Sequence, residues 1–162
     1  MTSSTATTVV HTIYIAAPAQ RVWDAITQSE LTTQWGYGGA VEFDLRPGGA
    51  FRNLSTPQMR EMGMGETAVE GEVLEVDPPR LLVLAWRPMW QPDPPTTRVT
   101  WELTEYPNGQ TKVVLRHDVS AAPEQFAEFD GGGDPEGGGG GWPWSLSGLK
   151  TLLETGRPMD RP

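Results

Sequence analysis

The sequence of 162 residues contains no cysteine and only two histidines. The lack of cysteine excludes disulfide bonds, thiolate nucleophiles and zinc sites with sulfur ligands. His11 and His117 lie far apart in the sequence, and neither has a histidine or glutamate at the spacing typical of a metal-binding helix. We therefore expect no metal and no cofactor.

Positive charge is also scarce. Lys and Arg number 12 against 21 Asp and Glu, which gives a formal net charge of -9. A protein that binds a phosphate backbone needs a basic face, so this balance argues against a nucleic-acid partner. It also means that anionic ligands are not attracted at long range.

Long apolar runs are the third absence. No window approaches the roughly 18 apolar residues of a membrane-spanning helix, and the first ten residues lack the basic start and apolar stretch of a secretory signal. We expect a cytoplasmic protein without a membrane span. Hydrophobic residues nevertheless make up 37% of the chain, with seven Trp, four Phe and three Tyr, so the chain has the apolar surface to fold.

The N-terminal pattern predicts one strand and two short helices. Apolar and polar residues alternate over residues 8–15, which indicates a strand. Pro18 suits the first turn of a helix that continues to residue 27. Ser29 is typical of a helix cap, and we expect a second short helix over residues 30–35.

The remainder of the chain reads as a meander followed by a helix. Strands are expected, between turns rich in Gly, Pro and Asn, over residues 40–45, 50–55, 67–76, 81–86, 98–105 and 111–117. The last element is a helix over residues 142–155, stopped by Gly156 and Pro158, with one apolar face formed by Trp142, Leu146, Leu149 and Leu153.

This order predicts an α+β fold: a curved antiparallel sheet of about seven strands with the C-terminal helix packed on it. We expect one domain over residues 8–156, a flexible N-terminus over 1–7, a Gly-rich loop over 130–141 and a tail over 157–162. A helix of about 14 residues is only roughly 20 Å long. Because it cannot cover the whole sheet, an interior cavity is expected.

Several motifs in order resemble the SRPBCC superfamily, and within it the group named after the C-terminal domain of the activator of the Hsp90 ATPase. The resemblance spans about residues 8–155. It is carried by Pro18-x-x-x-Val22-Trp23, Trp35, Arg46-Pro47-Gly48-Gly49, the run from Gly71 to Leu81, Trp86, and Gly141-Trp142-x-x-x-Leu146-x-x-Leu149-Lys150.

The resemblance implies a helix-grip fold related to START lipid-transfer domains and the birch pollen allergen, with a hydrophobic cavity between the sheet and the C-terminal helix. It also implies a range of roles: binding of lipids or hormones, cyclisation of aromatic polyketides, and contact with a chaperone in eukaryotic co-chaperones. A fold by itself does not choose among these roles.

His117 is the best single candidate for chemistry. It shares a strand face with Val113 and Leu115, so it should point toward the interior, where it would act as a general acid or base or serve as a hydrogen-bonded core residue. His11 and Asp118 are interpreted as structural.

Aromatic and methionine side chains are the candidates for ligand contact. Those in the loops around residues 57–65 and 86–95 would either rim an apolar pocket or seal the core. The predicted ligand-binding set is Trp35, Phe43, Phe51, Met59, Met62, Trp86, Trp90, Trp101, Leu115, His117, Trp142, Leu146 and Leu149.

Two further features stay open. Glu70 and Glu72 lie in a strand with apolar residues on both faces, so either would be a buried carboxylate or a surface residue. The Gly-rich loop is either a lid or a surface loop. Asp130, Asp134 and Glu136 within it lack the order of a calcium-binding loop.

Three functions follow from these observations. The first is binding of a small aromatic, acyl or lipid-like molecule in the cavity, and the second is an enzyme of the cyclase or aromatase kind that uses His117. The third is an interaction module similar to the chaperone activator. Whether the chain is an enzyme is left open, as are a protein partner and the choice between monomer and homodimer.

Overall fold

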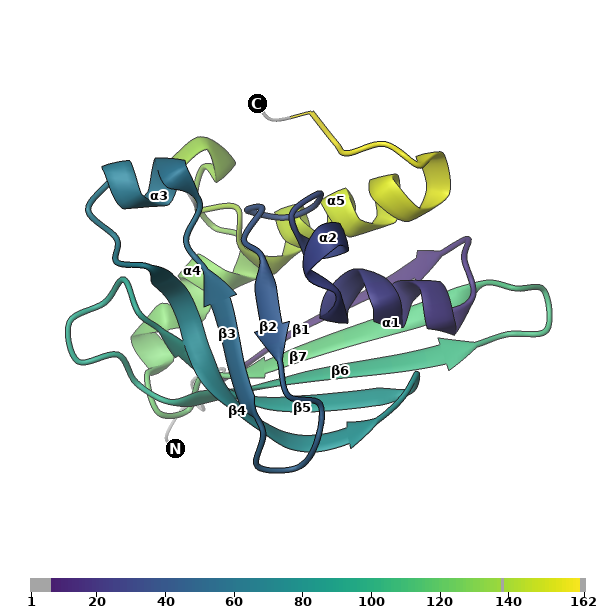
Figure 1. Ribbon diagram of the computed structural model, residues 1–162, viewed down its shortest axis with the longest axis horizontal. Coiled ribbons are helices and arrows are strands. Elements are labelled where there is room, and N and C mark those ends of the chain that lie inside the picture. The colour runs from purple at the N-terminus through teal and green to yellow at the C-terminus, as the bar shows by residue number, and fades with distance from the viewer. Residues whose placement is uncertain (1–6, 138, 161–162) are drawn as a thin grey trace, which may run out of the picture.

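A seven-stranded antiparallel sheet forms the frame of the molecule (Figure 1). The computed structural model describes residues 7–137 and 139–160. Its strands follow the order β1-β7-β6-β5-β4-β3-β2. They are β1 (Thr8–Ile15), β2 (Val41–Phe43), β3 (Ala50–Leu54), β4 (Thr67–Asp77), β5 (Leu81–Pro88), β6 (Thr97–Glu105) and β7 (Thr111–Asp118).

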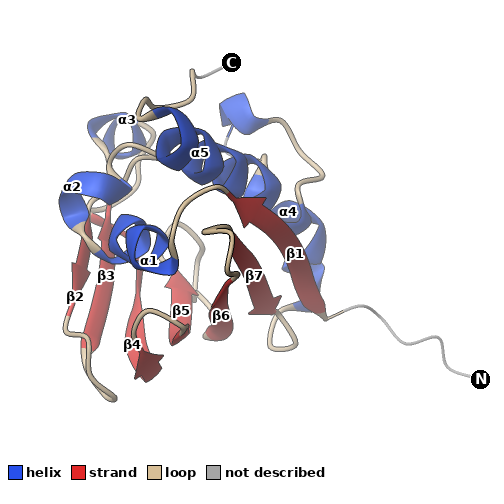
Figure 2. Ribbon diagram, turned by 90° about the vertical axis from the view of Figure 1, so that its right-hand side faces the viewer, coloured by secondary structure: helices blue, strands red, loops and turns tan. Residues whose placement is uncertain are grey.

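The helices gather on the concave face of this sheet (Figure 2). They are α1 (Ala19–Thr27), α2 (Ser29–Thr32), α3 (Pro57–Glu61), the 3₁₀ turn η1 (Pro123–Gln125), α4 (Phe126–Asp130), the 3₁₀ turn η2 (Pro135–Gly137) and α5 (Gly141–Thr155). The predicted α+β helix-grip architecture is confirmed. In the described part of the chain, no helix has the length and apolar character needed to cross a membrane. Of the predicted terminal segments, residues 1–6 and 161–162 lie outside the described residues.

The second predicted helix differs from the structure at both ends. Ser29 is the first residue of α2 rather than its cap, which is Gln28 and makes no side-chain capping bond. The helix stops at Thr32 rather than at residue 35. Trp35 therefore lies in the following loop, where its indole Nε1 donates to the carbonyl oxygen of Ala25 over 2.8 Å. The Trp35 side chain is thus positioned by a loop and not, as predicted, by the face of a helix.

Two short helices were not predicted. In α3, the Thr56 hydroxyl accepts a hydrogen bond from the backbone N–H of Met59, and Pro57 occupies the first turn, so the local signals of a helix start are present in a helix of only five residues. The other, α4, follows η1 and is capped after Asp130 by Gly131, whose φ of 95° is in the left-handed region that glycine adopts without strain.

A β-bulge settles the orientation of the two carboxylates in β4. The register shifts between Val73 and Glu75, so Leu74 has no partner on β5 and the faces change places beyond it. Val73 is buried on the inner face, whereas Glu70 faces Arg87 across the strands and Glu72 is exposed. The Glu70 carboxylate pairs with Arg87 at 3.2 Å. Both glutamates are therefore surface residues, one of the two alternatives left open.

The C-terminal helix packs its apolar face onto the sheet. Leu146, Leu149 and Leu153 are buried, as their spacing predicts. Complete burial of each such side chain is worth about 1.5–3 kcal/mol. Gly156 then ends the helix with a φ of 77°.

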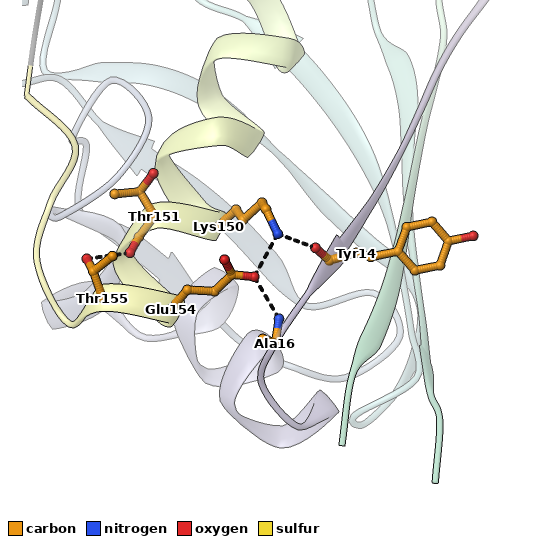
Figure 3. Close-up of polar contacts among 6 residues, drawn as sticks. All are labelled: Tyr14, Ala16, Lys150, Thr151, Glu154 and Thr155. Atoms are coloured by element: carbon orange, nitrogen blue, oxygen red, sulfur yellow. Dashed lines mark hydrogen bonds and ion pairs between the residues drawn. The ribbon is translucent and has the colours of Figure 1, made fainter. Parts of the chain in front are cut away.

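Polar contacts fix the far end of this helix to β1 (Figure 3). The Lys150 ammonium donates to the carbonyl oxygen of Tyr14 over 2.7 Å, and the Glu154 carboxylate accepts from the backbone N–H of Ala16 over 2.8 Å. Lys150 and Glu154 also pair with each other at 2.7 Å. These bonds lower the pKa of Glu154, the hydrogen bond from Lys150 most strongly. The C-terminal half of α5 is thus anchored at the end of β1, and the N-terminal half borders the interior.

Gly71 offers a test of the sheet geometry. A Cβ added there would overlap the carbonyl oxygen of Ala85 on β5, whereas a Cβ added at Gly65 meets nothing within 4 Å. We expect Gly71→Ala to lower the free energy of unfolding by about 2 kcal/mol or more. Gly65→Ala, the matched control, should change it by less than about 0.5 kcal/mol. Urea denaturation measures both, and equal midpoints for the two variants would contradict the close strand approach.

Candidate functional site

A cavity of about 590 Å³ lies between the concave face of the sheet and the helices. Its wall is largely apolar, and the sheet contributes side chains from β2 to β6. Trp101 of β6, a member of the predicted ligand-binding set, faces the interior and is in edge contact with Trp35 at 6.2 Å and with Trp142 of α5 at 5.9 Å between ring centroids. Aromatic pairs at these separations are favourable. Trp101 thus joins the loop after α2 to the start of α5.

Another part of the cavity wall is formed by β2, which is an edge strand of the sheet, and by its neighbour β3. Phe43 of β2 and Phe51 of β3 stack at 4.9 Å with an interplanar angle of 22°. Cross-strand pairing sets them opposite each other. Both rings, which belong to the predicted ligand-binding set, lie in the cavity wall.

The rim consists of two loops. Met59, Met62 and Met64 come from α3 and the residues after it, and Trp90 follows β5. Met62 is 67% exposed and Trp90 38% exposed, which is unusual for side chains of this size. Trp90 makes an edge contact with Trp86 at 6.0 Å. These residues surround the cavity rather than only seal a core.

The Gly-rich segment also contributes to the wall. Pro135, Glu136 and Gly141 line the cavity together with Phe129 of α4. Gly141 has a φ of 61°, and a Cβ there would lie 2.5 Å from the carbonyl oxygen of Phe129, so this turn needs glycine. The segment therefore carries α4 into α5 along the cavity.

His117 lies behind this wall in a chain of hydrogen bonds. The indole Nε1–H of Trp142 donates to His117 Nδ1 over 3.1 Å. Since Nδ1 accepts, Nε2 carries the proton of the neutral ring and donates to the Thr97 hydroxyl over 2.8 Å. The Thr97 hydroxyl in turn donates to the carbonyl oxygen of Trp86 over 3.1 Å. Every polar atom of the imidazole has a partner.

Burial fixes the charge state of this histidine. His117 has no exposed surface and contacts the rings of Trp86 and Phe129 at 4.9 and 4.6 Å. Loss of solvation lowers its pKa to about 4, although the nearby Asp118 acts in the opposite direction. His117 is therefore a neutral residue that orients Trp142.

The predicted ligand-binding residues divide into two groups. Four are buried but do not border the cavity: Leu115, His117, Leu146 and Leu149. Nine line it: Trp35, Phe43, Phe51, Met59, Met62, Trp86, Trp90, Trp101 and Trp142.

Four of the wall residues that sequence reasoning missed carry polar groups or belong to an unpredicted helix. Phe129 was missed because α4 was not recognised, although Phe126 and Phe129 have helical spacing. Glu128 belongs to the same helix. Asn53 and Ser145 were passed over as polar, yet Asn53 is two residues from Phe51 on its strand and Ser145 is three from Trp142 on its helix.

The remaining titratable candidates lie elsewhere. His11 Nε2 is 3.3 Å from Asp130 Oδ1, which connects β1 to the end of α4. Asp118 accepts from the backbone N–H of Ser120 over 2.9 Å, and this bond lowers its pKa. Within residues 7–137 and 139–160, no three His, Cys, Asp or Glu side chains are placed to hold a metal ion.

The match to a family model establishes the family to which the chain belongs. The model described as activator of Hsp90 ATPase homolog 1-like protein matches residues 16–154. The chain belongs to this family. The predicted resemblance to the SRPBCC group that contains it is thereby confirmed.

Several solved structures have the same fold as this chain. DynU16, from the dynemicin biosynthetic locus, is 23% identical with a TM-score of 0.71; the match covers 94% of this chain and 49% of that protein, so the chain spans about half its length. CalU16 from Micromonospora echinospora is 22% identical with a TM-score of 0.64, covering 91% and 76%.

An HSP90 activator, PFC0360w from Plasmodium falciparum, is 23% identical with a TM-score of 0.56 over 70% of this chain and 74% of that one. At these identities the likeness establishes the fold. None of the curated protein sequences compared with the chain matches it.

His117 predicts a particular pH dependence of stability. Its pKa is about 4 when folded and about 6.5 when unfolded, so between these values the unfolded chain binds more protons. The stabilisation is complete above pH 6.5 and falls as the pH falls toward 4, by about 3 kcal/mol in all.

Urea denaturation of the wild type and His117→Gln at several pH values isolates this effect, because the carboxylates common to both proteins cancel in the difference. The variant should be less stable at neutral pH and should lose less on acidification. Parallel pH profiles would contradict a buried neutral imidazole.

Proposed function

We propose that the chain binds a small apolar molecule in the cavity between the sheet and α5. The observation that carries this proposal is the cavity of about 590 Å³ with a largely apolar wall that contains many aromatic and methionine side chains. Ligand pockets of known proteins have volumes of about 300–1,000 Å³ and are lined mainly by hydrophobic and aromatic side chains. The volume suits a compact ring system or a folded acyl chain.

The rim supports entry of such a molecule. Met62 and Trp90 keep much of their apolar surface in contact with solvent. Thioether and indole groups make favourable contacts with aromatic ligands, and the unbranched methionine adapts to their shape. A ligand that covered these side chains would remove apolar surface from water at about 25 cal/mol per Å².

Catalysis of the cyclase kind ranks second because of the surroundings of His117. As a general base, His117 would need Nδ1, which accepts from Trp142. The Trp142 indole stands between the imidazole and the cavity, which it lines. A reaction at His117 therefore requires Trp142 to move, whereas ligand binding requires no such change.

Contact with a chaperone is a candidate favoured by the description of the family model. Its test is the rate of ATP hydrolysis by purified Hsp90 with and without the chain. Stimulation at stoichiometric amounts would support it, and an unchanged rate together with no measurable complex would exclude it.

The ligand proposal is tested by the melting temperature of the protein against fatty acids, flavonoids, aromatic polyketides and sterols. At a hundredfold excess over Kd, a ligand that binds only the folded state stabilises it by about 2.7 kcal/mol. For a domain of this size the melting temperature should rise by several degrees. No change with any class of compound would contradict the proposal.

A variant with a blocked cavity tests the same ligand proposal. Ala68 lines the cavity, whereas Ala85 lies on the outer face of the sheet opposite Glu72 and Arg98. We expect Ala68→Trp to abolish the ligand-induced shift and Ala85→Trp to retain it. Cooperative unfolding of both variants shows that they fold, and an undiminished shift in a folded Ala68→Trp would place the ligand elsewhere.

A further inference from the structure

Ser145 is a polar group inside the apolar wall. It belongs to α5, is only 6% exposed and lines the cavity. Its neighbour Ser147 donates to the carbonyl oxygen of Pro143 over 2.7 Å. The Ser145 hydroxyl has no hydrogen-bond partner among the described residues. Among the described residues, the side-chain polar atoms that are enclosed without a hydrogen-bond partner belong to His11, Ser55 and Gln125, so Ser145 Oγ is accessible from the cavity and is open to a hydrogen bond with an occupant.

Asn53 provides a second such group. It lies on β3, is half-buried and lines the cavity. Its carboxamide packs directly against Gly39, where an added Cβ would overlap its oxygen. The structure gives this carboxamide no hydrogen bond within the described chain. Since Ser145 lies in the same way beside Gly36, the two groups flank one loop, residues 36–39.

The charges around the cavity have one sign. Glu128 and Glu136 belong to the wall and are exposed, so they lie where the cavity meets solvent. Partial loss of solvation raises the pKa of Glu128. Among the described lining residues there is no Lys, Arg or His. An anionic ligand would therefore pass two carboxylates and find no cation to pair with.

We propose that the ligand is an uncharged, mainly apolar ring system with a hydroxyl or carbonyl group that hydrogen-bonds to Ser145, with Asn53 as the second polar contact. This inference rests on the proposed function, because it names the class of molecule that the cavity takes. Serine and asparagine each donate and accept, so they suit a neutral oxygen substituent. Carboxylates, including fatty acids, are disfavoured by the same wall.

Three probes of nearly equal size separate these ideas: methylpyrene, hydroxypyrene and pyrenecarboxylate, with binding followed by pyrene fluorescence. We expect the wild type to bind hydroxypyrene about fivefold more tightly than methylpyrene, the factor typical of one hydrogen bond between neutral groups. Pyrenecarboxylate should bind more weakly than either. Ser145→Ala should remove the preference for hydroxypyrene and leave the Kd of methylpyrene nearly unchanged.

Ser147→Ala, on the exposed side of the same helix, is the control and should keep the preference. Equal binding of hydroxypyrene and methylpyrene to the wild type, or an undiminished preference in Ser145→Ala, would overturn the inference while leaving the cavity proposal intact. Tightest binding of pyrenecarboxylate would also overturn it. Failure of all three probes to bind, with no thermal shift from any compound class, would instead count against the proposed function.

Discussion

A single helix must cover a sheet that is wider than the helix is long. The 15 residues of α5 extend about 22 Å, whereas seven strands spaced by roughly 4.8 Å extend about 29 Å from edge to edge. Short helices and loops close the difference, and some of their side chains form the rim of the cavity. The interior volume follows from this mismatch, so the cavity is a property of the architecture and its chemistry a property of the wall.

The hydrogen-bonded chain from Trp142 through His117 and Thr97 to Trp86 gives that wall its order. It joins α5, β7, β6 and β5, and it fixes the indole of Trp142; at its other end it reaches the backbone carbonyl of Trp86. A neutral histidine suits this task because it donates at one nitrogen and accepts at the other. The residue with the strongest sequence signal for chemistry thus has a geometry suited to positioning aromatic surface.

Much of the fold was predictable because its signals are local. Alternation located the strands, and the spacing of Trp142, Leu146 and Leu149 located α5 and its apolar face. The inward direction of His117 followed from the same alternation. Its partners did not, because Thr97 and Trp142 reach it only through strand register and the placement of α5. The bulge at Leu74 was equally hidden, since no residue there distinguishes it from a regular strand.

Polar wall residues were the hardest to predict. Ser145 and Asn53 share faces with aromatic residues, but a serine or asparagine within an apolar pattern usually marks a surface or a turn. Only the folded structure shows that each side chain lies in the cavity wall without a hydrogen-bond partner among the described residues.

The aromatic wall has a spectroscopic consequence. Trp35, Trp101, Trp142, Trp86 and Trp90 form one connected series with successive centroids about 6 Å apart, and they are five of the seven tryptophans in the chain. Because five of the seven tryptophans belong to this series, most of the near-ultraviolet absorption comes from the cavity wall. Indoles this close also behave as coupled chromophores. The near-ultraviolet circular dichroism of the whole protein is in effect a signal from one site, which an occupant would alter without any added label.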